Sequence, residues 1–178
     1  MDIALISDTH VPSRASHIPD TFRERIEAAD HVIHAGDFDS DGALSNVRAM
    51  AARLTAVGGN MDPRIGLPDR ATVELGGVTF VATHGTGSKH GYEDRVATIV
   101  RAEADAEEHG STSPRSHAHE DAEAVGVAGH THEVMDTTHG GVRLLNPGSA
   151  TGAAPAEGAT MMTATVRDGE LDVELHER

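Results

Sequence analysis

The chain has 178 residues, which is enough for one domain with a sizeable core and too few for two comfortable ones. It contains no cysteine, so disulfides and thiolate metal sites are excluded and any metal must be held by oxygen and imidazole ligands. Asp and Glu number 29 against 14 Lys and Arg, a net charge of −15 that argues against general binding of DNA or RNA.

The charge balance also carries information about habitat. Lys89 is the only lysine, and aromatic residues make up 2% of the chain. An acidic surface can simply keep a protein in solution, but with so little lysine it indicates adaptation to molar salt, where the Debye length is about 3 Å. No apolar stretch is long enough to cross a membrane, and residues 1–8 lack the basic region of a signal peptide. We therefore expect a halophilic, cytoplasmic protein with no membrane partner.

The first half of the chain alternates strand and helix patterns. Ile3–Ile6 is a short apolar run that ends in polar residues, as a buried strand does before a loop. This alternation predicts a layered α/β sheet. In chain order there follow a helix at 19–29, a strand at His31–Ala35, a helix at Ala43–Ala52, a strand at Leu54–Val57, two strands at Ala71–Leu75 and Val78–Ala82 around the turn Gly76-Gly77, and a helix at Glu93–Ala104.

Residues 105–123 differ in kind, because they contain scarcely any side chain that could form a core. The segment predicts an exposed, flexible acidic insertion. His117 and His119, followed by Glu120 and Asp121, imitate a metal site in composition. Without a rigid scaffold the ion itself would have to order these ligands, so we interpret the segment as a surface loop.

The last third of the chain returns to β structure, with Gly-containing turns at Gly140-Gly141 and Asp168-Gly169. An α/β half followed by such a meander predicts two packed sheets with helices outside, in a single domain of residues 1–178. The five strands are expected at Ala124–Ala128, Glu133–Thr137, Val142–Leu145, Thr160–Val166 and Leu171–His176.

Five segments share one layout, in which a strand is followed by a polar loop with residues of metal-ligand type. Ligands bind at the carboxyl ends of strands in sheets of this class, so the five loops can converge on one mouth. The segments are Asp8-Thr9-His10, Gly36-Asp37-Phe38-Asp39, Gly58-Gly59-Asn60-Met61-Asp62, Thr83-His84-Gly85 and Gly129-His130-Thr131-His132.

The pattern suits a pair of divalent ions. Two such ions about 4 Å apart repel each other and need a carboxylate between them, and imidazole with carboxylate suits Mn, Zn, Fe, Ni or Co. In an extended backbone, the outer residues of Asp8-Thr9-His10 point to the same side, and so do those of His130-Thr131-His132. Taken singly, Asp8 could cap a turn and Asn60 could occupy a left-handed turn position. All five segments in order predict a metal centre.

At these residues the sequence resembles the calcineurin-like metallophosphoesterase superfamily, in particular its small bacterial and archaeal phosphodiesterase branch. The resemblance runs from Ile3 to about Val173, apart from 105–123, and includes the loop Asn146-Pro147-Gly148-Ser149. It implies an α/β fold that is a four-layer sandwich of two packed mixed β-sheets flanked by helices. It also implies hydrolysis of phosphodiester bonds by a hydroxide that bridges two metal ions.

The resemblance also assigns roles to residues. One metal would take Asp8, His10 and His132, the other would take Asn60, His84 and His130, and Asp37 would bridge the two. Mn is the first choice for the ions, and Ni, Zn, Fe, Co or Mg are alternatives. The ions would neutralise charge on the phosphoryl oxygens together with Asn60, the expected catalytic residue.

Met61 departs from the pattern of many members, which carry a histidine there that is thought to protonate the leaving oxygen. A thioether has no proton to donate. The small phosphodiesterase branch often lacks this histidine too, so the departure fits the branch. It leaves the general acid open among a metal-bound water, the substrate itself and a nearby histidine such as His90.

Other polar residues are expected to support the site. We interpret His34 as packed and hydrogen-bonded beneath the metals, His31 as structural, and Asn146–Ser149 as shaping a loop. Asp39 and Asp62 are expected to fix their loops and not to bind metal.

Two other functions compete with hydrolysis of a small phosphate ester. A eukaryotic retromer subunit resembles this branch and serves as a scaffold, but it lacks part of the ligand set. A single-metal hydrolase or oxygenase would need fewer ligands than the seven present here. We therefore expect an enzyme with a small phosphate-ester substrate and no general nucleic-acid partner, while assembly into homo-oligomers stays open.

Overall fold

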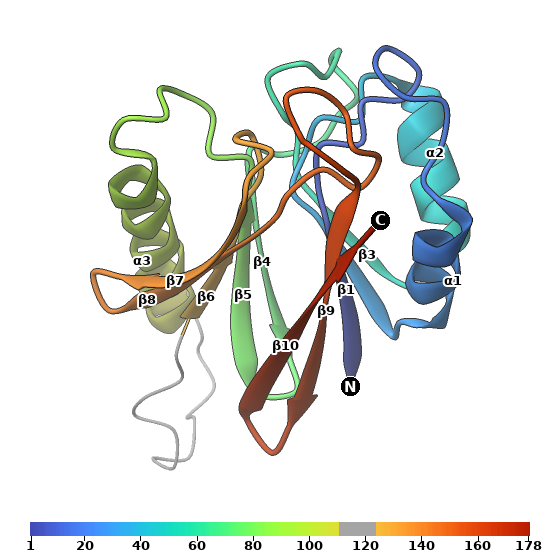
Figure 1. Ribbon diagram of the computed structural model, residues 1–178. Coiled ribbons are helices and arrows are strands. Elements are labelled where there is room, and N and C mark those ends of the chain that lie inside the picture. The colour runs from blue at the N-terminus through green and yellow to red at the C-terminus, as the bar shows by residue number, and fades with distance from the viewer. Residues whose placement is uncertain (111–123) are drawn as a thin grey trace.

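The computed structural model describes residues 1–110 and 124–178 (Figure 1). Within these residues the chain forms ten strands and three helices. In order they are β1 (Asp2–Ile6), α1 (Asp20–Ala28), β2 (His31–His34), α2 (Asp41–Met50), β3 (Leu54–Ala56), β4 (Arg70–Leu75), β5 (Val78–Thr83), α3 (Tyr92–Gly110), β6 (Ala124–Val127), β7 (Val134–His139), β8 (Val142–Pro147), β9 (Thr160–Arg167) and β10 (Glu170–Glu177).

The described strands form two five-stranded mixed sheets. Sheet A has the order β10-β9-β1-β2-β3, in which β1, β2 and β3 are parallel and β9 and β10 are antiparallel to their neighbours. Sheet B has the order β4-β5-β6-β8-β7, with β5, β6 and β8 parallel and an antiparallel strand at each edge. The predicted α/β fold of two packed mixed sheets flanked by helices is confirmed.

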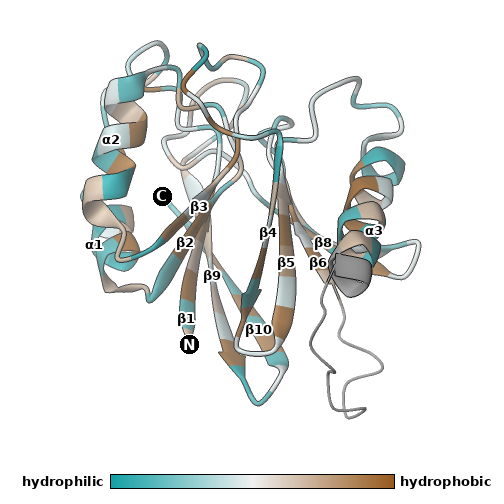
Figure 2. Cartoon of the chain, turned by 180° about the vertical axis from the view of Figure 1, so that it is seen from behind, coloured by the Kyte–Doolittle hydropathy of each residue, from teal (hydrophilic) through white to brown (hydrophobic). Residues whose placement is uncertain are grey.

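Alternate residues of the central strands pack into different layers. On β1, Ile3 and Leu5 belong to the core between the two sheets, whereas Ala4 and Ile6 pack in the core with α1 and α2. On β5, Phe80 faces the core between the sheets and Val81 packs in the cluster that includes α3. The layers therefore stack in the order α1 and α2, sheet A, sheet B and α3 (Figure 1). Figure 2 shows hydrophobic residues along the central strands and mixed hydropathy along each helix.

Two-residue turns connect the antiparallel strands that are consecutive in the chain, β4 to β5, β7 to β8 and β9 to β10. Gly76 and Gly77 have φ of 63° and 91° and join β4 to β5, with Leu75 paired to Val78. Positive φ at both central residues is the geometry that matches the twist of a hairpin, and glycine adopts it without steric cost. The hairpin predicted from this dipeptide is confirmed. Strand ends differ from the prediction by one or two residues, the usual uncertainty of such boundaries.

The third helix is longer than predicted. It covers Tyr92–Gly110, whereas the sequence pattern placed its end at Ala104. Residues 105–110, which the prediction assigned to the insertion, therefore belong to this helix. Their composition, Asp-Ala-Glu-Glu-His-Gly, contains good helix formers, and the low hydrophobicity of the segment hid this propensity. The remainder of the predicted insertion, including His117 and His119, lies outside the described residues.

Within the described part of the chain, no helix combines the length and the apolar composition that a membrane crossing requires.

Candidate metal centre

The predicted ligands lie on loops that follow five strands. Asp8 and His10 follow β1, Asp37 follows β2, Asn60 follows β3, His84 follows β5, and His130 and His132 follow β6. Backbone hydrogen bonds join the loops within each sheet: the N–H of Asp8 donates to Gly36 O at 3.0 Å, and the N–H of Gly129 donates to His84 O at 3.3 Å. Between the sheets, the N–H of His130 donates to Asp8 Oδ2 at 3.1 Å. The loops of both sheets thus meet at the carboxyl ends of the parallel strands, as the sequence predicted.

Five of the seven predicted ligands form two overlapping groups of buried side chains. Within each group, one potential ligand atom per residue lies within 4.8 Å of the others. His132 Nε2 is 3.2 Å from Asp8 Oδ1, and Asp37 Oδ2 is 3.5 Å from His10 Nε2 and 3.3 Å from His84 Nε2. The groups are Asp8, His10 and His132, and Asp8, Asp37 and His84.

Three imidazoles of these groups are held in the same way. His84 Nδ1 donates to Ala35 O at 2.7 Å, and His132 Nδ1 donates to Ala153 O at 2.8 Å. His10 Nδ1 is 2.9 Å from the carboxylate of Asp39. Because these partners only accept, Nδ1 carries the proton and Nε2 presents a lone pair to the centre. Such outer partners fix the tautomer and the ring orientation of histidines that bind metals.

The free lone pairs show that the residues fit a cation. His10 Nε2 and His132 Nε2 lie 3.1 Å apart, so two lone pairs face each other beside the carboxylate of Asp8. His84 Nε2 is buried without a hydrogen-bond partner, although it lies close to Asp37. Either protons or metal ions must relieve this arrangement, and the mixture of carboxylate and imidazole is a common donor set for divalent transition metals.

The electrostatics point the same way. Burial alone would lower the pKa of His84 and His132, but the carboxylates of Asp37 and Asp8 outweigh it and raise the pKa of both imidazoles. Burial would raise the pKa of Asp37, yet the adjacent His84 and the N–H of Met61 hold it below its ordinary value. The site therefore favours positive charge among its carboxylates.

The ligand backbone is strained. Asp8, His10, Asp37, His130 and His132 all have φ between 46° and 72°, a region that costs a non-glycine residue about 1–3 kcal/mol. The expectation that the two triplets are extended was wrong, because their outer residues are left-handed. At Asp8 and His10 this conformation still directs the side chains to one place. Such strain persists where the surroundings impose it, which is common at functional sites.

His130 and Asn60 are placed differently from the other five. The ring of His130 lies beside His84, with centroids 5.2 Å apart, but its Nε2 donates to Gly87 O at 2.7 Å. Asn60 is exposed in the turn before Met61, whose N–H donates to Asp37 Oδ1 at 2.9 Å. Neither residue belongs to the two ligand groups found among the described residues, so their predicted role as ligands stays a prediction.

Two acidic residues organise the loops, as the sequence suggested. Asp62 accepts hydrogen bonds from the backbone N–H groups of Asp37, Phe38, Asp39 and Gly59 at 2.6–3.1 Å. Asp39 does more than expected, because it orients His10 and also contacts the hydroxyl of Ser13. Sequence reasoning missed this contact, since no spacing rule connects His10 to a residue 29 positions later.

The Asn146–Ser149 loop lies beneath the ligands. Ser149 Oγ donates to Asp8 O at 2.7 Å, and Asn146 Nδ2 donates to Gly129 O at 2.9 Å. Ser7, which the sequence analysis left without a role, places its hydroxyl 2.7 Å from Asp8 Oδ2. Its position directly before Asp8 was the available signal. The loop thus supports the ligands of β1 and β6.

Two further histidines are packed into the fold. His34 is fully buried, stacks on Phe38 and accepts the N–H of Gly36 through Nδ1 at 3.1 Å. Burial lowers the pKa of His34 to about 3, so the ring is neutral. Its Nε2 lies 3.3 Å from the hydroxyl of Thr9, the residue between Asp8 and His10. His31 is bonded to Thr55 Oγ1 at 2.8 Å and is structural, as predicted.

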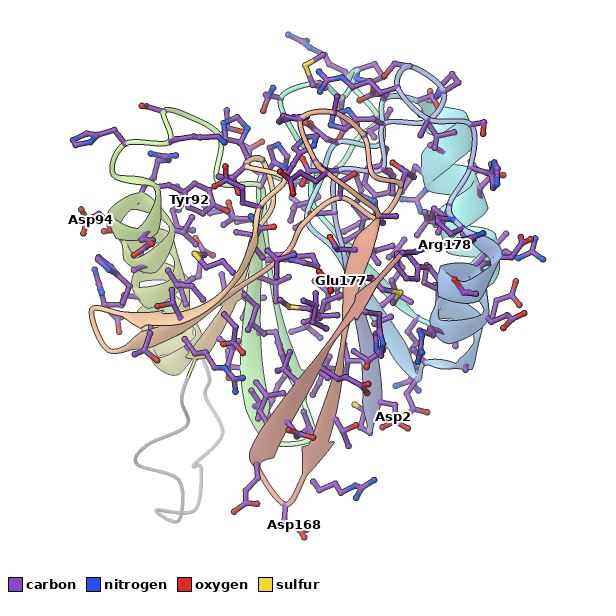
Figure 3. All side chains as sticks on the ribbon, viewed as in Figure 1. Asp2, Tyr92, Asp94, Asp168, Glu177 and Arg178 are labelled. Carbon is purple, nitrogen blue, oxygen red and sulfur yellow. The ribbon has the colours of Figure 1, made fainter. Side chains whose placement is uncertain are left out.

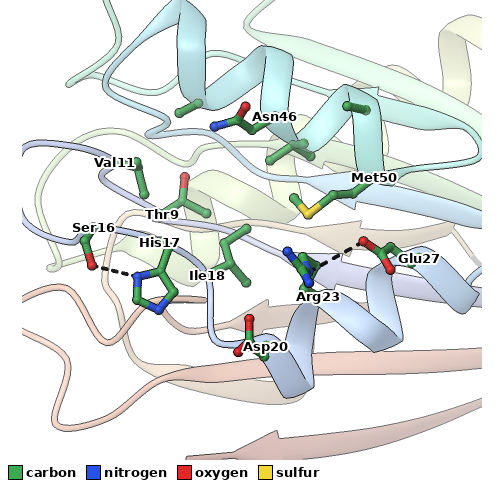
Figure 4. Close-up of a pocket in the computed structure, with 13 residues that line it drawn as sticks. Thr9, Val11, Ser16, His17, Ile18, Asp20, Arg23, Glu27, Asn46 and Met50 are labelled. Atoms are coloured by element: carbon green, nitrogen blue, oxygen red, sulfur yellow. Dashed lines mark hydrogen bonds and ion pairs between the residues drawn. The ribbon is translucent and has the colours of Figure 1, made fainter.

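Two grooves adjoin the centre. One, of about 450 Å³, lies between α1, α2 and the 11–18 segment and is lined by side chains such as Ile18, Arg23 and Met50 (Figure 4). None of the predicted ligands lines it. The other, of about 580 Å³, is lined by His132 and by residues of 155–160 and 177–178. It opens directly beside a ligand.

Comparison with known proteins identifies the family. The profile of the calcineurin-like phosphoesterase superfamily domain matches residues 1–169. The chain belongs to this superfamily. A protein of Methanothermobacter thermautotrophicus named "Probable metallophosphoesterase" is 29% identical over 179 residues, with 98% of this chain and 91% of that protein covered.

Solved structures share the fold of this superfamily member. Vps29 of Entamoeba histolytica, in complex with zinc, is 23% identical, covers 99% of each chain and has a TM-score of 0.71. A protein described as a novel archaeal phosphodiesterase is 22% identical, covers 99% of this chain and 100% of its own, and has a TM-score of 0.67. Membership of this metal-dependent family agrees with the His and Asp groups that could bind metal and supports a hydrolase.

Proposed function

We propose that this protein is a dinuclear metal-dependent phosphoesterase that hydrolyses phosphodiester bonds, with manganese as its ion. The observation that carries the proposal is the common orientation of His10, His84 and His132. All three rings are anchored through Nδ1 and direct Nε2 at the carboxylates of Asp8 and Asp37. A surface cluster of histidines would have no reason to share this arrangement.

The ligands divide into two sets around one carboxylate. Asp8, His10 and His132 would hold one ion, and His84, His130 and Asn60 would hold the other. Asp37 would belong to both sets, and this is supported by the distances of 3.5 Å and 3.3 Å from its Oδ2 to His10 and His84. For His130 the nitrogen available is Nδ1, because Nε2 carries the proton that it donates to Gly87 O.

When bound, the divalent ions supply Lewis-acid polarisation of the phosphoryl group and activation of a water molecule. The protein's own residues supply position and charge. The anchored imidazoles keep the ligand atoms in place, so little reorganisation is needed during the reaction. Asn60 is exposed and directly precedes Met61, whose N–H donates to Asp37, so we expect its amide to reach a phosphoryl oxygen at the centre. Met61 follows it and has no proton to give to the leaving alcohol.

The groove beside His132 suggests the size and charge of the substrate. Its volume of about 580 Å³ is sufficient for the alcohol part of a small ester. Its charged lining residues are Glu133, Glu157, Glu177 and Arg178, so carboxylates predominate. A second phosphate group would be repelled there. We therefore favour small phosphodiesters over nucleic acids.

A hydrolysis panel tests the proposal. Metal-depleted protein is reconstituted with Mn, Ni, Zn, Fe, Co or Mg and assayed on phosphomonoesters, phosphodiesters and cyclic nucleotides at low and molar KCl. We expect the highest rate on phosphodiesters with Mn. Metal binding without turnover of any ester would contradict the proposal. It would favour a non-catalytic scaffold, the alternative considered from the sequence, and the fold is shared with Vps29.

A further inference from the structure

The loop between His84 and α3, residues 85–91, controls the orientation of a predicted ligand. It reads Gly-Thr-Gly-Ser-Lys-His-Gly and has no regular secondary structure before residue 90. Two groups of Gly87 face His130 Nε2, the carbonyl oxygen at 2.7 Å and the N–H at 3.3 Å. The carbonyl contact is much the shorter, so Gly87 O accepts the proton of Nε2. The ring of His130 is thus held by this loop, whereas the ring of His84 is held by the carbonyl of Ala35, directly after β2, and that of His132 by the carbonyl of Ala153, between β8 and β9.

One guanidinium holds this loop at its start, middle and end. Arg95, in the first turns of α3, donates from Nη2 to Gly85 O at 3.0 Å and to Ser88 O at 2.9 Å, and from Nη1 to Gly91 O at 3.4 Å. Gly87 packs on the same group, since a Cβ at this position would lie 3.0 Å from Arg95 Cζ. Among the described residues, no ion pair involves Arg95, so its charge serves these carbonyls.

The same end of α3 also contacts the loop that carries His130. Tyr92 OH donates to Gly129 O at 2.6 Å, directly before His130. The guanidinium of Arg95 lies 5.6 Å from the centre of the Tyr92 ring. Figure 3 shows Tyr92 at the upper end of α3, next to the loops. Neighbouring side chains of one helix therefore fix both sides of the His130 environment.

We propose that Arg95 is a positioning residue of the metal centre, which holds the 85–91 loop so that Gly87 keeps His130 in the Nε2–H tautomer with Nδ1 free to bind metal. The inference rests on the proposed function, since it assumes that His130 is a ligand. Arginine is required because its planar fork donates to several carbonyls at once. Lysine is a compact charge and would reach fewer of them.

The first test reads the tautomer without any metal. Long-range ¹H–¹⁵N spectra of metal-depleted protein distinguish the two tautomers once the imidazoles are neutral. The pH is raised until the histidine signals stop changing, because carboxylates raise the pKa of His84 and His132. We expect Nε2–H for His130 and Nδ1–H for His84 and His132. Arg95→Gln should convert His130 to a mixture and leave His132 unchanged. An unaltered His130 signal in Arg95→Gln would overturn the inference.

The matched control is Arg101, on the same helix. Its Nη1 donates to Gly140 O at 2.9 Å, in the turn between β7 and β8 and away from the ligands. Arg101→Gln should leave the His130 signal and metal binding unchanged, which separates positioning from a general effect on α3. Arg95→Lys, which keeps the charge, should give a partial return towards the wild-type tautomer. A variant of Arg101 that altered His130 equally would contradict a specific role for Arg95.

The second test is a calorimetric titration with Mn²⁺. Loss of an outer partner typically weakens metal binding by about 10–100-fold, so Arg95→Gln should weaken one of the two binding events by this factor and spare the other. Equal affinities in wild type and Arg95→Gln would overturn the inference while leaving the proposed function intact. Failure of the wild-type protein to bind two ions would instead overturn the proposed function.

Discussion

The two halves of the candidate centre, which are the proposed ligand sets of the two ions, differ in how firmly their side chains are held. His10 and His132 are buried, their Nδ1 atoms are bonded, and their Nε2 atoms already face Asp8. In contrast, Asn60 is exposed in a turn and His130 is held by a loop outside the sheet frame. The first half is preorganised by buried contacts, whereas in the second half only His84 is buried and anchored in this way, and Asn60 and His130 depend on exposed loops. Differences between variants of the two halves therefore report how each ion is held.

The largest effect should come from the residue that both halves share. Asp37→Ala removes the carboxylate between His10 and His84, and we expect hydrolysis to fall by about 10³-fold or more, since metal ions supply several kcal/mol of transition-state stabilisation. Asp39→Ala removes only the outer partner of His10 and should cost about 10–100-fold. Rates and metal content of both variants check this order. Equal losses would contradict a shared role of Asp37.

Two adjacent glycines provide a matched pair. A Cβ on Gly59 would overlap Asp37 Oδ1, whereas a Cβ on Gly58 would meet only ordinary contacts with Leu67 at 3.8 Å and 3.9 Å. Gly59→Ala should therefore approach the loss seen for Asp37→Ala, while Gly58→Ala should stay near wild type. Metal content measured with activity shows whether the loss passes through the carboxylate. A fully active Gly59→Ala would show that the position of Asp37 is not critical.

Met61 directly follows Asn60 in the second half, and it determines how strongly the rate of hydrolysis depends on the leaving group. Without an acid there, aryl esters should be hydrolysed far faster than alkyl esters, because a departing alkoxide keeps its charge. A positioned acid contributes about 10²–10⁴-fold, so we expect Met61→His to improve alkyl esters by about 10²-fold and aryl esters little. Rates across a series of leaving-group pKa values measure this. A flat series for wild type would contradict this account of Met61.

His34 packs behind the first half, next to Thr9, and its contribution to stability is the smallest of these effects. Its pKa of about 3 in the folded protein lies below the ordinary value of 6.5, so the unfolded chain binds the proton first as the pH falls. The stability from neutral His34 is complete above about pH 6.5 and is lost towards pH 3, with a slope of at most about 1.4 kcal/mol per pH unit. The slope should be smaller in His34→Gln, whose amide can keep both hydrogen bonds. Urea unfolding of metal-free protein from about pH 7 to pH 5 tests this, and identical slopes would contradict it.

Much of the buried part of the centre could be predicted from the sequence. Apolar runs such as Ile3–Ile6 end at polar residues, and the rule that loops meet at the carboxyl ends of parallel strands brings Asp8, Asp37 and His84 together. The dipeptide Gly76-Gly77 specified its hairpin through backbone conformation alone. These are local signals, so they can be read without knowledge of tertiary contacts.

The remaining features depend on tertiary contacts. The orientation of the His130 ring depends on its contact with Gly87, a residue 43 positions earlier. No sequence pattern around His130 indicates this contact. The prediction of extended triplets was wrong because neighbouring loops impose a left-handed backbone on Asp8 and His132. The extension of α3 to Gly110 was missed because composition was given more weight than helix propensity.

The proposed function depends on the carboxylate of Asp37 joining two ions. Calorimetric titration of metal-depleted protein with Mn²⁺, followed by anomalous diffraction from Mn-soaked crystals, tests it most directly. We expect two ions about 4 Å apart, both bound by the carboxylate of Asp37, with His130 and Asn60 on the ion next to His84. A single ion on Asp8, His10 and His132, with Asp37 bound to none, would contradict it.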